Sequence, residues 1–294
     1  FNTVRFPQTR MGVEQVFYDG FYRAKAYQKE WDAYRAGKIK VAPRVDLELE
    51  VLAEILRSER FITCHSYIQS EINMLMHVAD SMGFRINTFT HILEGYKVAD
   101  KMHKHGVAGS TFSDWWAYKF EVNDAIPYNA ALMTEQGVLV CINSDDAEMG
   151  RRLNQEAAKT VKYGGLSEEQ AWKLVTLNPA KMLHVADRVG SIKEGKDADI
   201  VVWSDNPLSI YAKSEHTIVD GAVVFDRAAD LIRQAELKAE KQRLVQKMIG
   251  AKKGGASTRP ATPSYKAENE CEEDHHHGNS IWDRISNRWA NTEN

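Results

Sequence analysis

A regular alternation of short apolar runs with helical segments, between residues 60 and 163, most constrains what this chain can fold into. The runs are rich in β-branched and aromatic residues, and the segments between them carry apolar residues at helical spacing. The runs lie at 60–65, 84–90, 106–112 and 137–145, and the helical segments lie near 70–82, 94–105, 128–136 and 150–163. Near-continuous apolar strands joined by helices are typical of βαβ units, so the sequence predicts an α/β fold with a parallel sheet.

The segments on either side of this alternation have a different character. Residues 11–36 place apolar and aromatic side chains at helical spacing up to Gly37, which predicts one long amphipathic helix, and 47–57 predicts a second. Residues 198–203 and 216–225 are predicted strands with turn residues but no helical spacer. They are therefore expected to pair in a small antiparallel sheet.

The last part of the chain is expected to lack a packed core. Residues 228–250 predict a charged, solvated helix, and 251–294 form a low-complexity tail rich in Gly, Pro, Ser and Glu that should be disordered. The run His275, His276 and His277 in this tail is equally compatible with a metal-chelating tract, a tag fragment or a solvated run, so its role stays open.

Composition excludes several classes of protein and partner. The 294 residues are 43% hydrophobic and 27% charged, which is ordinary for a globular protein. The formal net charge is −3 and the first 230 residues hold no strongly basic block, so a nucleic-acid partner is not indicated. No apolar run approaches the ~18 residues that a membrane span needs, so a membrane partner is not indicated either.

Three of the four predicted strands end in a side chain that can bind a metal. These residues are His65, His91 and Asp145, separated by 26 and 54 residues, and 54 is two units of 27. The carboxyl ends of parallel strands and their loops converge on one face of the fold. If the strands curve into a barrel, all three side chains are expected to point into one basin.

Two imidazoles and one carboxylate suit metal-assisted hydrolysis. They are ligands for Zn²⁺ or a similar divalent ion, which lowers the pKa of bound water towards ~7 and polarises a substrate carbonyl. Asp145 is the candidate for catalytic general base and acid as well as metal ligand, because its carboxylate can take the water proton and pass it to the leaving group.

A structural interpretation of the same residues stays open beside this one. A histidine at a strand end is often a satisfied, partly buried residue, and an aspartate after a strand is commonly a helix N-cap. Asp146 or Ser144 could serve as that cap equally well.

The C-terminal motifs resemble those of a known family. Residues 165–208 contain T-x-N-P-A and a G-S-I-x-x-G-K-x-A-D-[IL]-V run, and residues 218–225 contain an I-V-D-G turn. Together these resemble the amidohydrolase superfamily, in particular its imidazolonepropionase-like and metal-dependent dipeptidase-like members. The likeness covers about residues 60–226.

The resemblance implies a fold and a metal site. The superfamily fold is a metal-bearing (β/α)₈ TIM barrel with a small β-sandwich built from both chain ends. On that basis, residues 1–190 are strands 5–8 of the barrel with their helices, and 191–227 are the C-terminal part of the sandwich domain. His65, His91 and Asp145 then match the ligands that end strands 5, 6 and 8, and Zn²⁺ or another divalent metal, as one or two ions, is the implied cofactor.

Two family features have no match in this sequence. The His-x-His at the end of strand 1 and the metal-bridging Lys or Glu of strand 4 are both absent. Four parallel strands cannot close a barrel, so their edge and apolar face would stay exposed. We therefore expect the chain to be the C-terminal part of a longer enzyme, and to be poorly active alone because two or three ligands hold Zn²⁺ weakly.

The expected function is hydrolysis of a carbon–nitrogen bond, in a cyclic or peptide-like small-molecule amide, by a metal-activated water. Tyr67, Trp115 and Trp116 are candidate substrate contacts, although the two tryptophans could equally well only pack. A homo-oligomer is compatible with the sequence.

Two other functions stay open. The first is an aminohydrolase (deaminase) of the same superfamily, but those enzymes tend to carry a glutamate three residues after the strand-5 histidine, where this chain has Ile68. Glu94 stands three residues after His91, which is the wrong strand. The second is a non-catalytic fragment or binding module that keeps the fold without a working site.

Overall fold

The four β-rich runs form one parallel sheet in the order β1-β2-β3-β4, which confirms the predicted α/β class. This computed structural model describes residues 4–257. The strands are shorter than the runs that predicted them, because only three or four residues of each run pair. Their bounds are β1 Thr63–His65, β2 Thr88–Thr90, β3 Ala108–Thr111 and β4 Val140–Ile142.

Helices connect successive strands, as the alternation predicts. The expected helix near 94–105 begins as a 3₁₀ turn, Gly95–Lys97, and becomes α-helical only from Ala99. The capping box at Ser167 and Gln170 is formed and begins α8. The helices of the sheet region are α3 Gln69–Met82, α4 Ala99–His105, α5 Asn129–Glu135, α6 Ala147–Gly150, α7 Leu153–Gly164, α8 Glu168–Lys173 and α9 Leu177–Met182, with a second 3₁₀ turn at Phe120–Val122.

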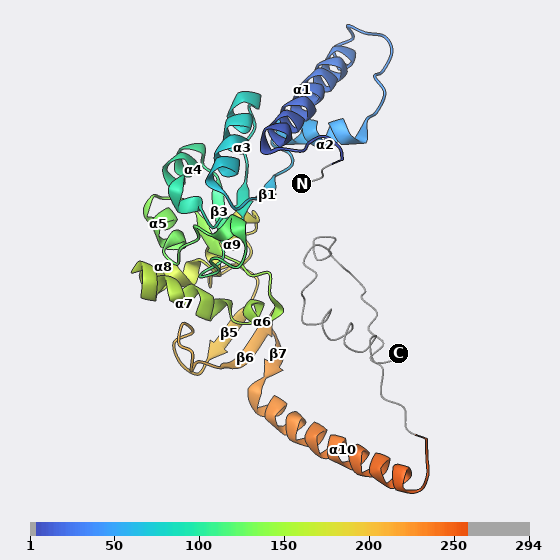
Figure 1. Ribbon diagram of the computed structural model, residues 1–294, viewed down its shortest axis with the longest axis vertical. Helices are drawn as coiled ribbons and strands as arrows, with labels where there is room; N and C mark the ends of the chain where they lie inside the picture. Colours follow the sequence, from blue (N-terminus) through green and yellow to red (C-terminus); the bar gives the residue numbers. More distant parts are fainter. Residues whose placement is uncertain (1–3, 258–294) are drawn as a thin grey trace. The chain divides into compact units, whose positions relative to one another are not determined.

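Two helices before the sheet form a hairpin beside α3 (Figure 1). They are α1, Arg10–Arg35, and α2, Leu47–Leu56, close to the predicted bounds. Phe21 of α1 stacks on Phe84 with ring centroids 4.1 Å apart, so the hairpin joins the main hydrophobic core. That core contains the inner faces of α3 and the sheet strands.

The two outer strands of the sheet have different surroundings. On the outer side of β4, Ile142 N–H donates to Leu174 O at 3.0 Å and Asn178 Nδ2 donates to Val140 O at 2.7 Å. Asn178 is the asparagine of the T-x-N-P-A motif, and its side chain hydrogen-bonds to the outer edge of β4. On β1, by contrast, Thr63 and His65 are exposed.

A small antiparallel sheet follows, as predicted from the absence of a helical spacer. Its strands are β5 Ile200–Trp203, β6 Ser214–Val219 and β7 Ala222–Asp226, in that order. The charged helix α10 spans Arg227–Lys253. Contacts divide the chain into two units, with the boundary between Ile232 and Arg233.

Some sequence-based expectations fall outside the described part of the chain. The histidine run at 275–277 and all but the first residues of the predicted tail lie there. Within residues 4–257, no helix combines the length and the apolarity that crossing a bilayer requires.

Candidate active site

The three predicted metal ligands lie at the same edge of the sheet. His65 is the last residue of β1, His91 directly follows β2, and Asp145 lies three residues beyond β4. The His65 and His91 ring centroids are 4.7 Å apart, and His91 Nε2 lies 3.5 Å from Asp145 Oδ1. The sheet therefore brings together residues that are 80 positions apart in sequence.

The backbone of His91 adopts an unusual conformation. Its φ is +62°, in the left-handed region that non-glycine residues seldom enter, and the residue is buried at 8% exposure. The turn is held on both sides, because Ile92 N–H donates to Ser110 O at 3.1 Å and the buried Asn129 Nδ2 donates to Ile92 O at 2.8 Å. A strained residue that its surroundings hold in place is typical of a functional site.

The choice of helix cap after β4 is decided by geometry. Asp146 Oδ1 accepts the N–H groups of Glu148 and Met149, both at 2.9 Å, and so begins α6. Asp145 therefore does not carry the capping role, and half of its side chain is exposed beside His91. The interpretation of Asp145 as a helix cap is therefore wrong, and its role as a ligand or base stays a prediction.

Aromatic rings line one side of the two histidines. Phe112 stacks on His91 with centroids 4.9 Å apart, and Trp115 stacks on Phe112 at 4.3 Å. Tyr67 meets His65 edge to face at 4.7 Å. The structure thus brings Tyr67 and Trp115 to the candidate site, whereas Trp116 is 49% exposed.

Lys119 is a member of this cluster that the sequence did not point to. Its Nζ donates to the Tyr67 hydroxyl at 3.0 Å and lies 4.1 Å from the centre of the Tyr67 ring. Desolvation raises the pKa of the neighbouring Tyr118 to about 12, and a hydrogen bond with Tyr67 acts in the same direction. Lys119 lies well beyond the end of β3, so no rule about strand ends selects it.

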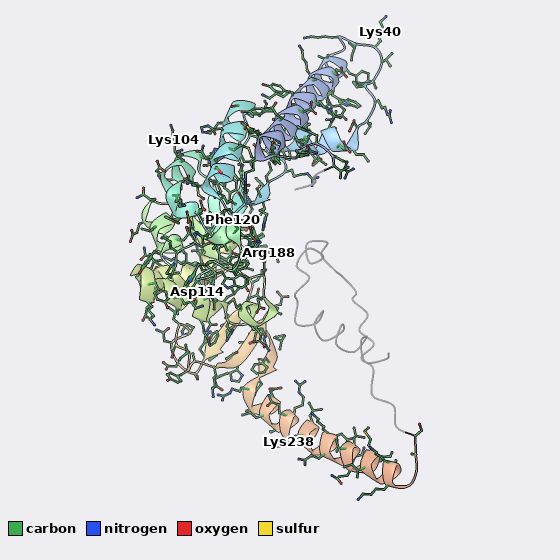
Figure 2. The ribbon with its side chains drawn as sticks, in the orientation of Figure 1. Lys40, Lys104, Asp114, Phe120, Arg188 and Lys238 are labelled. Atoms are coloured by element: carbon green, nitrogen blue, oxygen red, sulfur yellow. The ribbon has the colours of Figure 1, made fainter. Side chains whose placement is uncertain are left out.

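A buried polar network holds the loop that follows β3. Lys159 Nζ lies 2.9 Å from both Asp114 and Glu156, and Ser113 Oγ donates to Glu156 (Figure 2 labels Asp114). Desolvation opposes the charge of Lys159, but its hydrogen bonds to Glu156 and Asp114 outweigh it and keep the pKa of Lys159 raised. The network connects this loop to α7 and thereby holds the backbone next to Trp115 in place.

Asn143 is a second neighbour of His91 that the sequence patterns did not single out. Its Nδ2 lies 2.7 Å from His91 Nδ1, and its Oδ1 is buried with no hydrogen-bond partner. It stands two residues before Asp145, and its position just beyond β4 was the available signal.

The donor types in this cluster suit a divalent ion, although their positions do not complete a site. Two imidazoles and a carboxylate are zinc ligands. Across residues 4–257, however, no group of three or more His, Cys, Asp or Glu side chains has the geometry to hold a metal ion. His65, His91 and Asp145 therefore have the donor chemistry of a metal site without its complete geometry.

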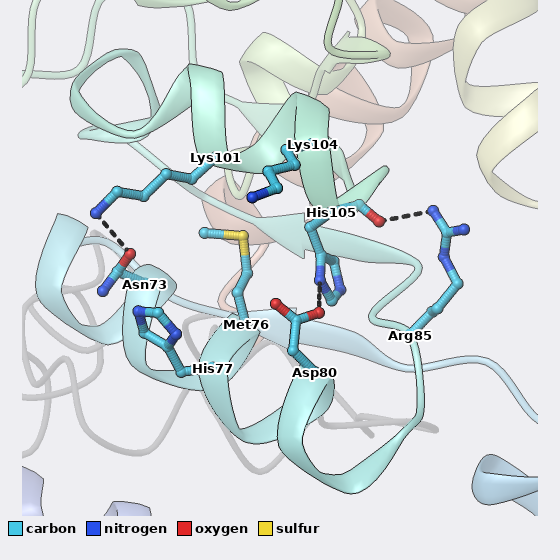
Figure 3. A pocket seen from close by; sticks show the side chains of 8 residues that line it. All are labelled: Asn73, Met76, His77, Asp80, Arg85, Lys101, Lys104 and His105. Carbon is cyan, nitrogen blue, oxygen red and sulfur yellow. Dashed lines mark hydrogen bonds and ion pairs between the residues drawn. The ribbon is translucent and has the colours of Figure 1, made fainter.

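A separate pocket of about 510 Å³ lies between α3 and α4, and no strand-end residue lines it (Figure 3). His105 Nδ1 lies 2.8 Å from Asp80 Oδ1 there, and His105 Nε2 accepts the N–H of Ile86 at 3.3 Å. Both ring nitrogens of His105 are thus used within the fold. His103, the other histidine of the H-x-H on this helix, contacts Gly137 O at 3.2 Å.

Comparisons with known proteins agree with the C-terminal motifs. Residues 125–227 match the amidohydrolase family. Over 251 residues the chain is 30% identical to amidohydrolase tasK of Hapsidospora irregularis. This match covers 81% of this chain and 25% of tasK. The chain is a relative of the amidohydrolases. The resemblance predicted from its C-terminal motifs is confirmed.

Two further proteins are similar to this chain. An imidazolonepropionase of Thermoplasma volcanium is 27% identical over 166 residues, covering 54% of this chain and 40% of the relative. The crystal structure of an amidohydrolase from Thermotoga maritima is similar with a TM-score of 0.68 and 30% identity, covering 76% of this chain and 58% of that one. This amidohydrolase relative therefore spans less than two thirds of each of these proteins.

Proposed function

We propose that this chain supplies the C-terminal half of a metal-dependent hydrolase that cleaves a carbon–nitrogen bond in a small amide. The observation that carries the proposal is the His91–Asp145 pair at 3.5 Å, with the His65 ring 4.7 Å from His91. Kinship with amidohydrolases supports the reaction class.

The proposed fold is half of a (β/α)₈ barrel with part of a β-sandwich. The exposed β1 edge supports it, because a parallel strand is normally covered on both sides. The coverage of 58% of the Thermotoga structure supports it as well. In this proposal, preceding strands pair with β1 and contribute the remaining metal ligands.

Each strand-end residue has a proposed role. His65 and His91 would hold a divalent ion through imidazole nitrogen, and Asp145 would contribute a carboxylate oxygen. An ion bound there would supply a Lewis acid that acidifies water and polarises the amide carbonyl. Asp145, half exposed and aimed at His91, takes the proton of the attacking water and delivers it to the leaving nitrogen.

The side chains around the pair favour a substrate that carries a carboxylate. The Lys119 ammonium and the Tyr67 hydroxyl, 3.0 Å apart, offer a charge and hydrogen-bond donors beside the histidines. Trp115 offers an apolar surface next to them. A peptide-like amide with a free carboxylate has both features, so we propose this substrate class.

The deaminase alternative has less support. Ile68 occupies the position where a proton-donating glutamate would stand, and it precedes α3. The carboxylate of Glu94 makes contacts within the fold, since its Oε2 accepts Gln69 N–H at 3.0 Å and lies 3.4 Å from Lys97 Nζ. Glu94 thereby stabilises the start of α3 rather than facing substrate.

The test is an amidase assay on N-acyl amino acids and dipeptides after zinc loading, with the complete gene product and with residues 1–294 alone. We expect hydrolysis by the complete product, weak or no hydrolysis by the shorter chain, and loss of zinc binding in His91→Ala. Zinc-independent hydrolysis, or an active Asp145→Asn variant, would contradict the proposal.

A further inference from the structure

The contact between Asn143 and His91 has consequences for which nitrogen of the imidazole can bind a metal. A neutral imidazole carries its proton on only one nitrogen, and the hydrogen bond made by the other nitrogen determines which one. His91 Nδ1 faces Asn143, while Nε2 faces Asp145. The side chain of Asn143 is therefore in a position to determine the tautomer of His91.

The amide of Asn143 can face His91 in two ways, related by a half-turn of its terminal group. With Nδ2 towards His91, the amide donates to Nδ1, and the imidazole proton then sits on Nε2, against Asp145. In this orientation Asn143 Oδ1 is buried without a partner. With Oδ1 towards His91, the oxygen accepts from Nδ1–H, and Nε2 keeps its electron pair.

We propose that Asn143 is a positioning residue whose side-chain oxygen accepts the Nδ1 proton of His91 and so leaves Nε2 to bind the divalent ion. The inference rests on the proposed function, because it assigns a role to His91 as a ligand. It gives a hydrogen-bond partner to the buried Asn143 Oδ1, which has none when Asn143 Nδ2 faces His91 Nδ1. Partners of this kind commonly fix the orientation of metal-binding histidines.

Two substitutions separate this role from simple packing. Asn143→Asp keeps the shape but can only accept from Nδ1–H, so it enforces the proposed tautomer. Asn143→Leu keeps a similar volume and offers no acceptor. A matched control is Asn87→Leu, which removes another asparagine that contacts a histidine, since Asn87 Oδ1 lies 2.7 Å from His184 Nε2.

The first measurement is the tautomer of His91 in metal-free protein, from ¹⁵N chemical shifts of labelled histidine assigned with His91→Gln. We expect the Nδ1–H form in the natural chain and in Asn143→Asp, and a shift towards the Nε2–H form in Asn143→Leu. This spectroscopic signature does not depend on metal binding, and a purely structural role of Asn143 would not move it.

The second measurement is zinc affinity, by competition with a chromophoric chelator. We expect Asn143→Leu to bind zinc about 10- to 100-fold more weakly than the natural chain. The zinc affinity of Asn87→Leu should stay within about threefold of the natural value. The zinc affinity of Asn143→Asp should stay within the same range or be higher. An Nε2–H tautomer in the natural chain, or equal behaviour of the Leu and Asp variants, overturns the inference. If His91→Ala leaves zinc affinity unchanged, the proposed metal site fails instead, and the tautomer measurement still decides the role of Asn143.

Discussion

Two histidine–carboxylate pairs in this molecule have similar chemistry and lie in different parts of the fold. His105 and Asp80 lie between α4 and α3, with a separation of 2.8 Å and side-chain exposures of 3% and 66% (Figure 3). His91 and Asp145 lie at the carboxyl ends of the strands, 3.5 Å apart, with exposures of 10% and 51%. In both pairs a buried imidazole meets an exposed carboxylate.

Both nitrogens of each imidazole contact other groups, and the difference lies in which groups these are and in the backbone that presents the ring. His105 ends a regular helix, and its two nitrogens contact Asp80 and the N–H of Ile86, so it ties α4 to α3 and to the chain entering β2. His91 has a left-handed backbone and turns its Nε2 towards a solvent-accessible carboxylate. Contact with an exposed carboxylate is therefore common to both histidines, and what distinguishes His91 is its left-handed backbone and its place at the carboxyl end of a strand.

The largest expected effect separates the two carboxylates. Asp145→Asn removes the proposed general base and a metal ligand, so we expect the turnover number of the complete enzyme to fall about 10²- to 10⁴-fold. Because Asp145 is half exposed, the melting temperature should change little. Asp80→Asn is the matched control and should keep full turnover; equal losses in both variants would erase the distinction between the pairs.

The next effect concerns stability rather than chemistry. His105→Leu leaves the Ile86 N–H without its acceptor in a buried setting, so we expect the free energy of unfolding to fall by about 2 kcal/mol. Urea denaturation measures this change, and zinc affinity should stay as in the natural chain. Weaker zinc binding in His105→Leu would show that the α3–α4 pair also bears on the metal.

A third prediction concerns the substrate side of the strand-end pair. Lys119→Met removes the ammonium beside Tyr67, so we expect KM for carboxylate-bearing amides to rise about tenfold with little change in kcat, as for a lost ground-state contact. Amides without a carboxylate serve as the control substrates. A similar KM increase for both substrate types would argue against recognition of a carboxylate by Lys119.

The smallest effect tests the strained backbone of His91. Because a left-handed conformation costs a residue with a side chain roughly 1–2 kcal/mol relative to glycine, His91→Gly should be more stable than His91→Ala by about 1 kcal/mol. The same Gly and Ala pair at His105, which is helical, should show the reverse order. Denaturant midpoints of the four variants measure both differences between the glycine and alanine variants.

Much of the α/β arrangement could be predicted from sequence, because strand and helix periodicities are local. The predicted runs around Thr88 and Val140 contain the observed strands, and the capping box at Ser167 is formed as expected. The helix near 94–105 was predicted whole but begins as a 3₁₀ turn, where the buried Gly95 is packed against Met133. That packing is a long-range effect that no local pattern records.

The candidate site was predictable only in part. His65, His91 and Asp145 could be selected because parallel strands end at one edge, and the structure brings their side chains together. The choice between Asp145 and Asp146 as helix cap could not be made, since both stand before the same helix. Their roles differ through backbone direction, which places Asp146 against the N–H groups of α6.

The amino-acid sequence by itself determined the order of strands and helices, the set of metal-capable residues at strand ends and kinship with the amidohydrolases, because these depend on local periodicity and short motifs. Only the tertiary structure decided which neighbours complete the site. Lys119 reaches Tyr67 across 52 positions, and Asn143 reaches His91 across the same separation. Such contacts depend on the path of the loops after β3 and β4, which is fixed by packing and by buried polar networks rather than by any local pattern.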